Sequence, residues 1–441
     1  MTQSSTWFNL DTAANIYPAI SNDRNTNVYR LSCELRETIR PEVLKQALDK
    51  AMEAYSYFRV VMRRGLFWFY LEPTDQEPDV VLESQRPCAR IFYKQIKSLL
   101  FQVSYFGGRI NLEMFHALAD GGGAIDFMRT IVYEYLVLVH REELPSPLPV
   151  LDISPSSPPY QAEDSFLRYY TEEGGKQGPF FKKALLLGGT TLPSNSVQVI
   201  SAKTSVRAVL TLAKGKKATL TAYLTALLIC AVYTEMTPRR FASRDIGVTI
   251  PVDLRGHFAS SSSRNFFGVV NVRYNFMGGA VDFDRVLESV TGQLNSKVGV
   301  ENLARSINYN ISLQKNIFAR FVPLFLKNFV LKRGYRRSES TATTVLSNMG
   351  RILMPEEFAP YIDNFSCLLN PSPIQKVKLC VSSYRDALML NFTSCIAETG
   401  IQKYVLRHLA AEGAPVCITT NTGTNMDSFA PVPEDQTELG L

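Results

Sequence analysis

Residues 109–123 read RINLEMFHALADGGG, and this stretch decides the expected fold and site. Residues 110–115 predict a strand that runs to His116, and a short loop then carries Asp120 into a run of glycines. A helix follows, because apolar side chains recur at helical spacing, at Ile125, Met128, Val132, Tyr135 and Val139. The local order is therefore strand, histidine, aspartate, glycines and helix.

This order suits acid–base chemistry. A neutral imidazole can accept a proton near neutral pH and return it later. Glycines let backbone and substrate approach closely, and the helix start adds positive potential and N–H donors. The alternative is an ordinary core or surface histidine. Asp120 and the glycines follow His116 closely, and the chain has only four histidines, which favours a functional role for His116.

Strand and helix signals alternate on both sides of this stretch. In the first half we expect a helix near 11–17, a strand at 27–34, a helix starting at Pro41, and strands at 67–71 and 97–105. In the second half we expect strands at 206–212, 246–251, 268–274, 343–346, 376–382 and 387–393, and helices at 219–235 and 401–411. This alternation predicts an α/β (α+β) fold throughout.

A proline-rich segment divides the chain. Six of the 23 prolines lie between residues 145 and 159, and this density is incompatible with both a helix and a central strand. We therefore expect an N-terminal lobe at 1–144, a crossover at 145–195 and a C-terminal lobe at 196–418. The polar, acidic residues 419–441 are expected to form a flexible tail.

Composition narrows the class of protein. The 441 residues are 46% hydrophobic and 20% charged, which excludes a disordered chain, a collagen-like repeat and a coiled coil. The net charge of +6 suits a phosphate-bearing small molecule or a weakly anionic surface, and does not indicate a nucleic-acid binder. Seven cysteines without a CxxC pair indicate neither a metal site nor a disulfide framework. The scattered cysteines favour a reduced, cytoplasmic setting. With no signal-peptide core and no long apolar run, we expect a soluble protein, and we expect it to be a monomer.

At the level of motifs, the sequence resembles a known superfamily. The segment 116–121 (HALADG) resembles the HxxxD(G) motif of CoA-dependent acyltransferases, which include chloramphenicol acetyltransferase, plant BAHD enzymes, condensation domains and alcohol acetyltransferases. The segments PVDLR (251–255) and NFFG (265–268) are similar to elements of the same superfamily. SNMG (347–350), LDTAANIYP (10–18) and LFWFYL (66–71) resemble the alcohol acetyltransferase branch. The resemblance extends from about residue 7 to about residue 410.

The resemblance implies two chloramphenicol-acetyltransferase-like lobes with an active-site channel between them. His116 would take the proton of an alcohol or amine acceptor as it attacks an acyl thioester, and then protonate the departing thiolate. Acyl-CoA, with acetyl-CoA as one candidate, would be the co-substrate. No acyl-enzyme and no tightly bound cofactor are expected. Two alternatives stay open: a carrier-protein-dependent condensation enzyme that forms amides, and a catalytically silent binding or membrane-associated relative.

The same resemblance suggests roles for further residues. Asp120 could orient the imidazole, but in the family this aspartate pairs with an arginine, and we favour that structural role with Arg255 as partner. Ser347 and Asn348 are candidate donors to the oxyanion of the tetrahedral intermediate, or else an ordinary turn. Asn271 is a weaker candidate for the same role.

Two basic clusters remain. Lys214, Lys216 and Lys217 precede a helix and could bind the CoA phosphates, or form a solvated turn. In residues 315–337, Phe318, Phe321 and later apolar residues alternate with Lys and Arg. This segment could meet a membrane surface or an acidic carrier protein. The commoner outcome is a core-facing helix with a charged outer face, and we expect that one. His140, His257 and His408 suggest no catalytic role.

Overall fold

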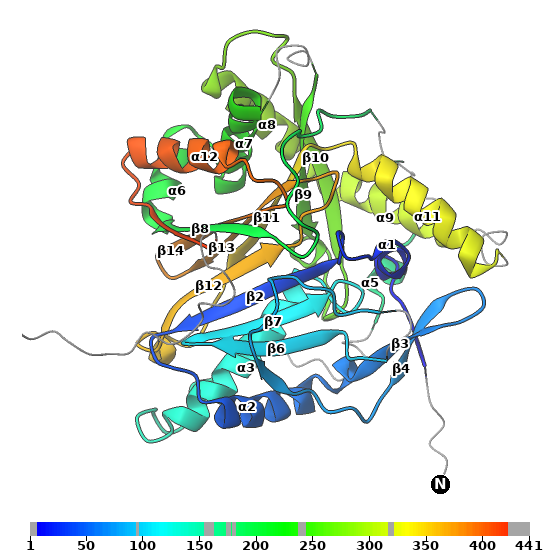
Figure 1. Ribbon diagram of the computed structural model, residues 1–441, viewed down its shortest axis with the longest axis vertical. Coiled ribbons are helices and arrows are strands. Elements are labelled where there is room, and N and C mark those ends of the chain that lie inside the picture. The colour runs from blue at the N-terminus through cyan, green and yellow to red at the C-terminus, as the bar shows by residue number, and fades with distance from the viewer. Residues whose placement is uncertain are drawn as a thin grey trace, which may run out of the picture.

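The computed structural model describes residues 7–93, 97–153, 163–172, 178, 182–236, 244–315 and 322–421. Within these residues, strands form a five-stranded sheet, a seven-stranded sheet and a small three-stranded sheet. The two larger sheets belong to two lobes, each with helices on its outer side (Figure 1). The expected two-lobed α/β architecture is confirmed.

The first lobe contains the strand that ends at the site. Its sheet has the order β12-β2-β7-β6-β5, with β2 (Val28–Leu35) and β7 (Arg109–Phe115) antiparallel at its centre. Strand β6 (Phe101–Phe106) follows β7, and the edge strands are β5 (Val80–Leu82) and β12 (Ile362–Leu369). Helices α2 (Pro41–Ala54) and α3 (Gly121–Val139) pack against each other below this sheet (Figure 1). Pro41 occupies the first turn of α2, as the sequence predicts.

A small sheet and a short helix flank this lobe. The small sheet joins β1 (Phe8–Asn9), β4 (Phe69–Pro73) and β3 (Val60–Arg64). A helical turn, η1 (Ala14–Ile16), leads into α1 (Tyr17–Ile20), so the helix expected near 11–17 lies slightly later in the chain. Helix α1 packs against the C-terminal-half helix α11 (Leu324–Glu339).

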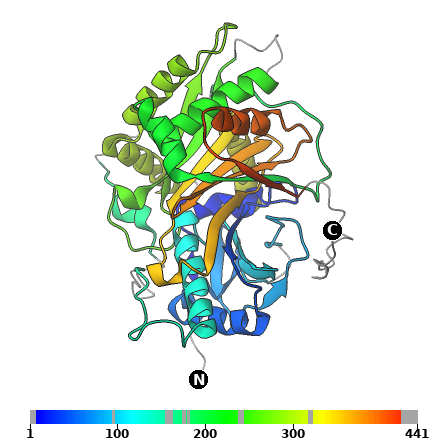
Figure 2. The same cartoon turned by 90° about the vertical axis from the view of Figure 1, so that its left-hand side faces the viewer.

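The second lobe has the strand order β10-β9-β11-β13-β14-β8-β15. These strands are β8 (Gln198–Ser205), β9 (Ile246–Asp253), β10 (Phe267–Tyr274), β11 (Thr344–Arg351), β13 (Val377–Tyr384), β14 (Ala387–Ser394) and β15 (Cys417–Thr420). Helices α6 (Val206–Gly215), α7 (Leu220–Met236), α8 (Phe283–Lys297) and α12 (Gly400–Ala411) lie over its outer side (Figures 1 and 2). Two further helices, α5 (Ser165–Arg168) and α9 (Val300–Lys315), pack together beside β10.

The run of apolar residues in α7 serves the core of the second lobe. All eleven residues from Ala222 to Val232 are buried, so this part of the helix has no solvent-exposed face. Among the described residues, no single helix is long and apolar enough to cross a bilayer. Helices α6 and α7 taken together have the required length and composition, but they meet at an angle of 81°.

Three expectations about the second half are wrong. Residues 206–212 form helix α6, because Ser205 caps it through a bond from the Ala208 N–H, and its buried residues Val209 and Ala213 are four apart. The strand is the preceding segment, β8. The tail does not begin at residue 419, since β15 extends to Thr420 and pairs with β8.

The third correction concerns the boundary between the lobes. Strand β12 (Ile362–Leu369) falls in the sequence range of the second lobe but pairs antiparallel with β2 of the first, with Phe365 opposite Cys33. Figure 1 shows it lying between β2 and the strands of the larger sheet. The Ser382 hydroxyl in β13 donates to the Phe365 carbonyl (2.8 Å), so β12 also contacts the second sheet.

Candidate active site

His116 lies directly after β7, in a loop fixed by hydrogen bonds to the first lobe. Its backbone N–H donates to the carbonyl of Asn27 (2.9 Å). Tyr29, on the neighbouring strand β2, donates its buried hydroxyl to the carbonyls of Ala119 (3.0 Å) and Asp120 (2.9 Å). The loop between the histidine and the aspartate is therefore held from both ends.

Aromatic rings surround the imidazole of His116. Tyr17 of α1 stacks on it with ring centroids 4.6 Å apart, Tyr29 meets it edge-on at 5.2 Å, and Phe267 of β10 lies at 5.4 Å. Burial among these rings lowers the pKa of His116 below 6.5, against a smaller opposing effect from Asp120. The imidazole is therefore neutral at neutral pH, which is the state that accepts a proton.

A relay of hydrogen bonds from the second lobe determines which nitrogen carries the proton. Asn265 donates its side-chain N–H to the Asp11 carboxylate (2.9 Å), so its Oδ1 is the atom that faces His116 Nδ1, 2.9 Å away. A carboxamide oxygen accepts hydrogen bonds, so Nδ1 must be the protonated nitrogen. Nε2 then keeps its lone pair and can act as a base.

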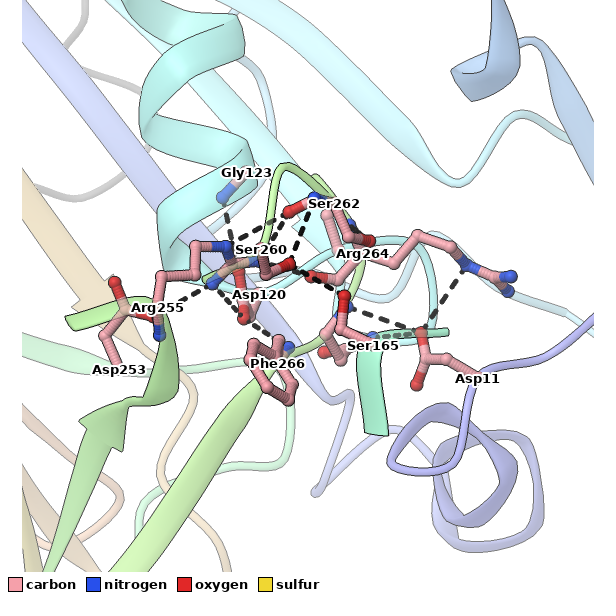
Figure 3. A network of polar contacts seen from close by, with 12 residues as sticks. Asp11, Asp120, Gly123, Ser165, Asp253, Arg255, Ser260, Ser262, Arg264 and Phe266 are labelled. Carbon is pink, nitrogen blue, oxygen red and sulfur yellow. Dashed lines mark hydrogen bonds and ion pairs between the residues drawn. The ribbon is translucent and has the colours of Figure 1, made fainter. Parts of the chain in front are cut away.

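Asp11 anchors this relay in the core. It is fully buried, accepts from the Ala14 N–H at 2.7 Å, and lies 3.6 Å from the guanidinium of Arg264. Burial raises the pKa of Asp11, and the charge of Arg264 opposes that rise. In Figure 3, Asp11 and Arg264 point toward each other from the first and second halves of the chain.

Asp120 points to Arg255. Its Oδ2 accepts from Arg255 Nη1 (2.9 Å) and from the Phe266 N–H (2.7 Å), while Oδ1 accepts from the Gly123 N–H (3.2 Å) and caps α3 (Figure 3). Arg255 also contacts Asp253 and the carbonyls of residues 262 and 264. The structure thus brings the two predicted partners together, across the two lobes.

The glycines after Asp120 permit the lobes to approach each other. A Cβ on Gly121 would lie 2.3 Å from Met349 Cε, and a Cβ on Gly123 would lie 2.0 Å from the carbonyl oxygen of Ser263. Both contacts come from the second half of the chain. At these positions the glycines allow the start of α3 to pack against the other lobe.

Ser347 and Asn348 lie within β11, not in a turn, and their side chains point in different directions. The Ser347 hydroxyl lies 3.7 Å from the sulfur of Met349, the residue that reaches Gly121, so it faces the loop of His116 and Asp120. Asn348 donates to Thr221 of α7 (3.0 Å) and accepts from the Gly350 N–H. The structure therefore separates the two oxyanion candidates.

The remaining candidates lie elsewhere. Lys214, Lys216 and Lys217 end α6 on the helical layer of the second lobe, where Lys216 pairs with Asp284 of α8 (2.8 Å). Asn271 accepts a hydrogen bond from Thr249 across β10 and β9 (2.7 Å). The groups packed on His116 come instead from α1, β2 and residues 265–267. Among the residues described, no group of three or more His, Cys, Asp or Glu side chains could hold a metal ion.

Four residues of this site, Asp11, Tyr17, Tyr29 and Asn265, were not predicted from the sequence. Asp11 and Asn265 lie inside segments that carry the family resemblance, and this position was the one indication in the sequence that they could belong to the site. Their pairing joins residues 254 positions apart, which no local pattern reveals.

The comparisons with known proteins support the fold. No family model matches the chain, and no curated protein matches it. TRI101 of F. sporotrichioides, solved with coenzyme A and T-2, gives a TM-score of 0.62 at 10% identity, over 93% of this chain and 100% of that one. The F. sporotrichioides trichothecene 15-O-acetyltransferase TRI3 gives 0.56 at 12% identity, over 92% and 94%. The first condensation domain of the CDA synthetase gives 0.56 at 15% identity, over 93% and 97%. The chain therefore has the two-lobed fold of CoA-dependent acetyltransferases and condensation domains.

Proposed function

We propose that this protein is an acyltransferase that moves an acyl group, acetyl among the candidates, from an acyl-CoA thioester to the hydroxyl or amine of a small molecule. The observation that carries the proposal is the Asp11–Asn265–His116 relay, which leaves the lone pair of Nε2 available as a base. Solved proteins of the same fold include one in complex with coenzyme A and one named as an O-acetyltransferase.

In the proposed reaction His116 transfers one proton twice. Nε2 takes the proton of the acceptor hydroxyl or amine while the acceptor oxygen or nitrogen bonds to the thioester carbonyl carbon. The tetrahedral intermediate collapses, the carbon–sulfur bond breaks, and Nε2–H protonates the thiolate. The products are an ester or amide and a free thiol. The fixed Nδ1–H lets Asn265 Oδ1 stabilise the imidazolium formed between the two transfers.

The intermediate carries a negative oxygen that needs a hydrogen-bond donor. We assign this role to the Ser347 hydroxyl, because it shares a face of β11 with Met349, which reaches Gly121 beside the catalytic loop. Asn348 is assigned a structural role, since its side chain already bonds Thr221 and Gly350.

The first experiment measures free thiol release from acetyl-CoA in the presence of panels of alcohols and amines. Release should depend on the acceptor, and His116→Ala should abolish it. A His116→Ala variant that keeps most of the rate would overturn the proposal. Asn265→Ala tests the relay: kcat should fall while KM for the thioester changes little, because the variant loses the fixed tautomer and keeps the binding surface.

One alternative has a specific observation in its favour. The likeness to a condensation domain allows a donor that is tethered to a carrier protein, with an amide as product. A comparison of the same acyl group on free CoA and on a carrier protein distinguishes the two, since a carrier-dependent enzyme responds weakly to free CoA thioesters. If neither donor is consumed, the protein is a silent relative.

A further inference from the structure

Helix α11 (Leu324–Glu339) packs one face on the molecule, as expected, but only half of its outer face is charged. Its buried and half-buried side chains, at 324, 327, 328, 331, 335 and 339, follow helical spacing and contact the rest of the molecule. Leu324 N–H donates to the Leu66 carbonyl (3.0 Å), and Lys327 donates to the Phe67 carbonyl (3.0 Å) beside the Trp68 ring. Phe318 and Phe321 lie outside the described residues.

The opposite face of α11 leaves large apolar side chains in water. Phe325 is 63% exposed, Phe329 69% and Val330 66%, with Leu326 beside them. Leu66, at the neighbouring turn between β3 and β4, is 73% exposed. Single exposed apolar residues are ordinary, but four on two consecutive turns, next to a fifth, form a patch of the kind that marks an interaction surface.

Positive charge continues the same face. Lys332, Arg333, Arg336 and Arg337 occupy the next two turns, at spacings of three, four and seven from Phe329 or Val330, and all four are exposed. The sole acidic residue of α11, Glu339, is buried and bonded by the Ser372 hydroxyl. The outer face is therefore apolar over its first half and cationic over its second.

We propose that this face, defined by Leu66, Phe325, Leu326, Phe329, Val330, Lys332, Arg333, Arg336 and Arg337, docks on the surface of an anionic lipid bilayer. The apolar side chains enter the boundary between headgroups and acyl chains, and the cations contact lipid phosphates. A bilayer offers both partners over a continuous surface, which matches a face that has apolar and cationic parts and no exposed acid.

A second copy of the chain fits this face less well. If two α11 helices paired in parallel, the cationic half of one would meet the cationic half of the other. If they paired antiparallel, each apolar half would meet a cationic half. Either arrangement places charge where it has no opposite partner, so charge complementarity selects the lipid surface.

The buried face of α11 lies toward the candidate active site. Helix α11 packs on α1 (Figure 1), and Tyr17 of α1 stacks on His116. A docked molecule would thus place α11 between the bilayer and α1, with the catalytic loop behind α1. The docking itself does not depend on acyl transfer, and vesicle binding tests it separately.

The experiment measures co-sedimentation of the full chain with phosphatidylcholine vesicles, with and without about one third phosphatidylglycerol, at low and high salt. We expect binding to the anionic vesicles, weakened by salt and more than about tenfold weaker without phosphatidylglycerol. The double variant Phe325→Ser/Phe329→Ser should lower the affinity by more than about tenfold. Arg333→Glu/Arg336→Glu should remove the preference for anionic lipid.

Exposed residues elsewhere supply matched controls. Leu353→Ser and Arg207→Glu change similarly exposed side chains on other elements and should leave vesicle binding unchanged. The inference fails if the chain binds no vesicles, or if both double variants bind like the unaltered chain. It also fails if the chain forms a dimer that the Phe variants dissociate, because a second copy would then cover the face.

Discussion

Replacing Asp120 by alanine tests the role of this carboxylate. The side chain accepts hydrogen bonds from Arg255, the Phe266 N–H and the Gly123 N–H, and it is 6% exposed. Asp120→Ala removes all three hydrogen bonds at once. It leaves the Arg255 guanidinium, itself mostly buried, with Asp253 as its remaining carboxylate partner among the contacts of this network.

The expected loss of stability follows from burial. Removal of one partner of a buried ion pair costs about 3–5 kcal/mol. Arg255 keeps the carbonyls of residues 262 and 264, which favours the lower end, about 3 kcal/mol, including about 1 kcal/mol for the lost cap of α3. Asp253 contacts the same guanidinium nitrogen at 3.0 Å but is 58% exposed, so Asp253→Ala should cost under about 1 kcal/mol.

Urea denaturation of the two variants, followed by fluorescence and circular dichroism, measures the difference in free energy of unfolding. Thiol release from acetyl-CoA is measured in parallel. The structural role predicts that Asp120→Ala loses stability and activity together, and that Asp253→Ala loses little of either. If Asp120→Ala is no less stable than Asp253→Ala and yet inactive, Asp120 acts on the imidazole and the reasoning is refuted.

The remaining predictions concern the reaction and the interface between the lobes. Because burial lowers the pKa of His116, the base stays neutral to a lower pH than a free histidine, so the acid limb of kcat/KM should have its midpoint below 6.5; a midpoint well above that value contradicts the burial effect. Ser347→Ala should lower kcat by about 10²–10³, while Asn348→Ala should mainly lower thermal stability; the reverse order would exchange their roles. Gly123→Ala should destabilise the protein by about 1–3 kcal/mol through its clash with a carbonyl, whereas Gly215→Ala, with open space around its Cβ, should not; equal melting temperatures would disprove the close approach.

The sequence predicted best what local pattern determines. The strand ending at His116, the glycines and helix α3 lie within about thirty residues, and hydrophobic periodicity identified them. The same method failed at residues 206–212, where Val206, Val209 and Ala213 fit a helix but the β-branched residues suggested a strand. Periodicity also could not reveal that the outer face of α11 stays uncovered, since it shows which residues share a face and not which face is buried.

The relay of Asp11, Asn265 and His116 could not be predicted from local sequence patterns. Asn265 reaches His116 across 149 residues and Asp11 across 254. Only the folded chain brings these side chains together, and their role depends on hydrogen-bond direction rather than on residue type. The pairing of Asp120 with Arg255 could be predicted because the family resemblance implies it; the spacing of the two residues in the sequence does not.

Strand β12 has a consequence for how this chain can be made and divided. Until residue 369 leaves the ribosome, β2 is the outermost strand of its sheet, and its backbone groups and apolar side chains lie on an open edge. The first lobe should therefore remain prone to aggregation through most of its synthesis. A fragment that ends within the proline-rich segment should aggregate when expressed alone. Such a fragment should stay in solution only when a second polypeptide supplies Ile362–Leu369 and completes the sheet.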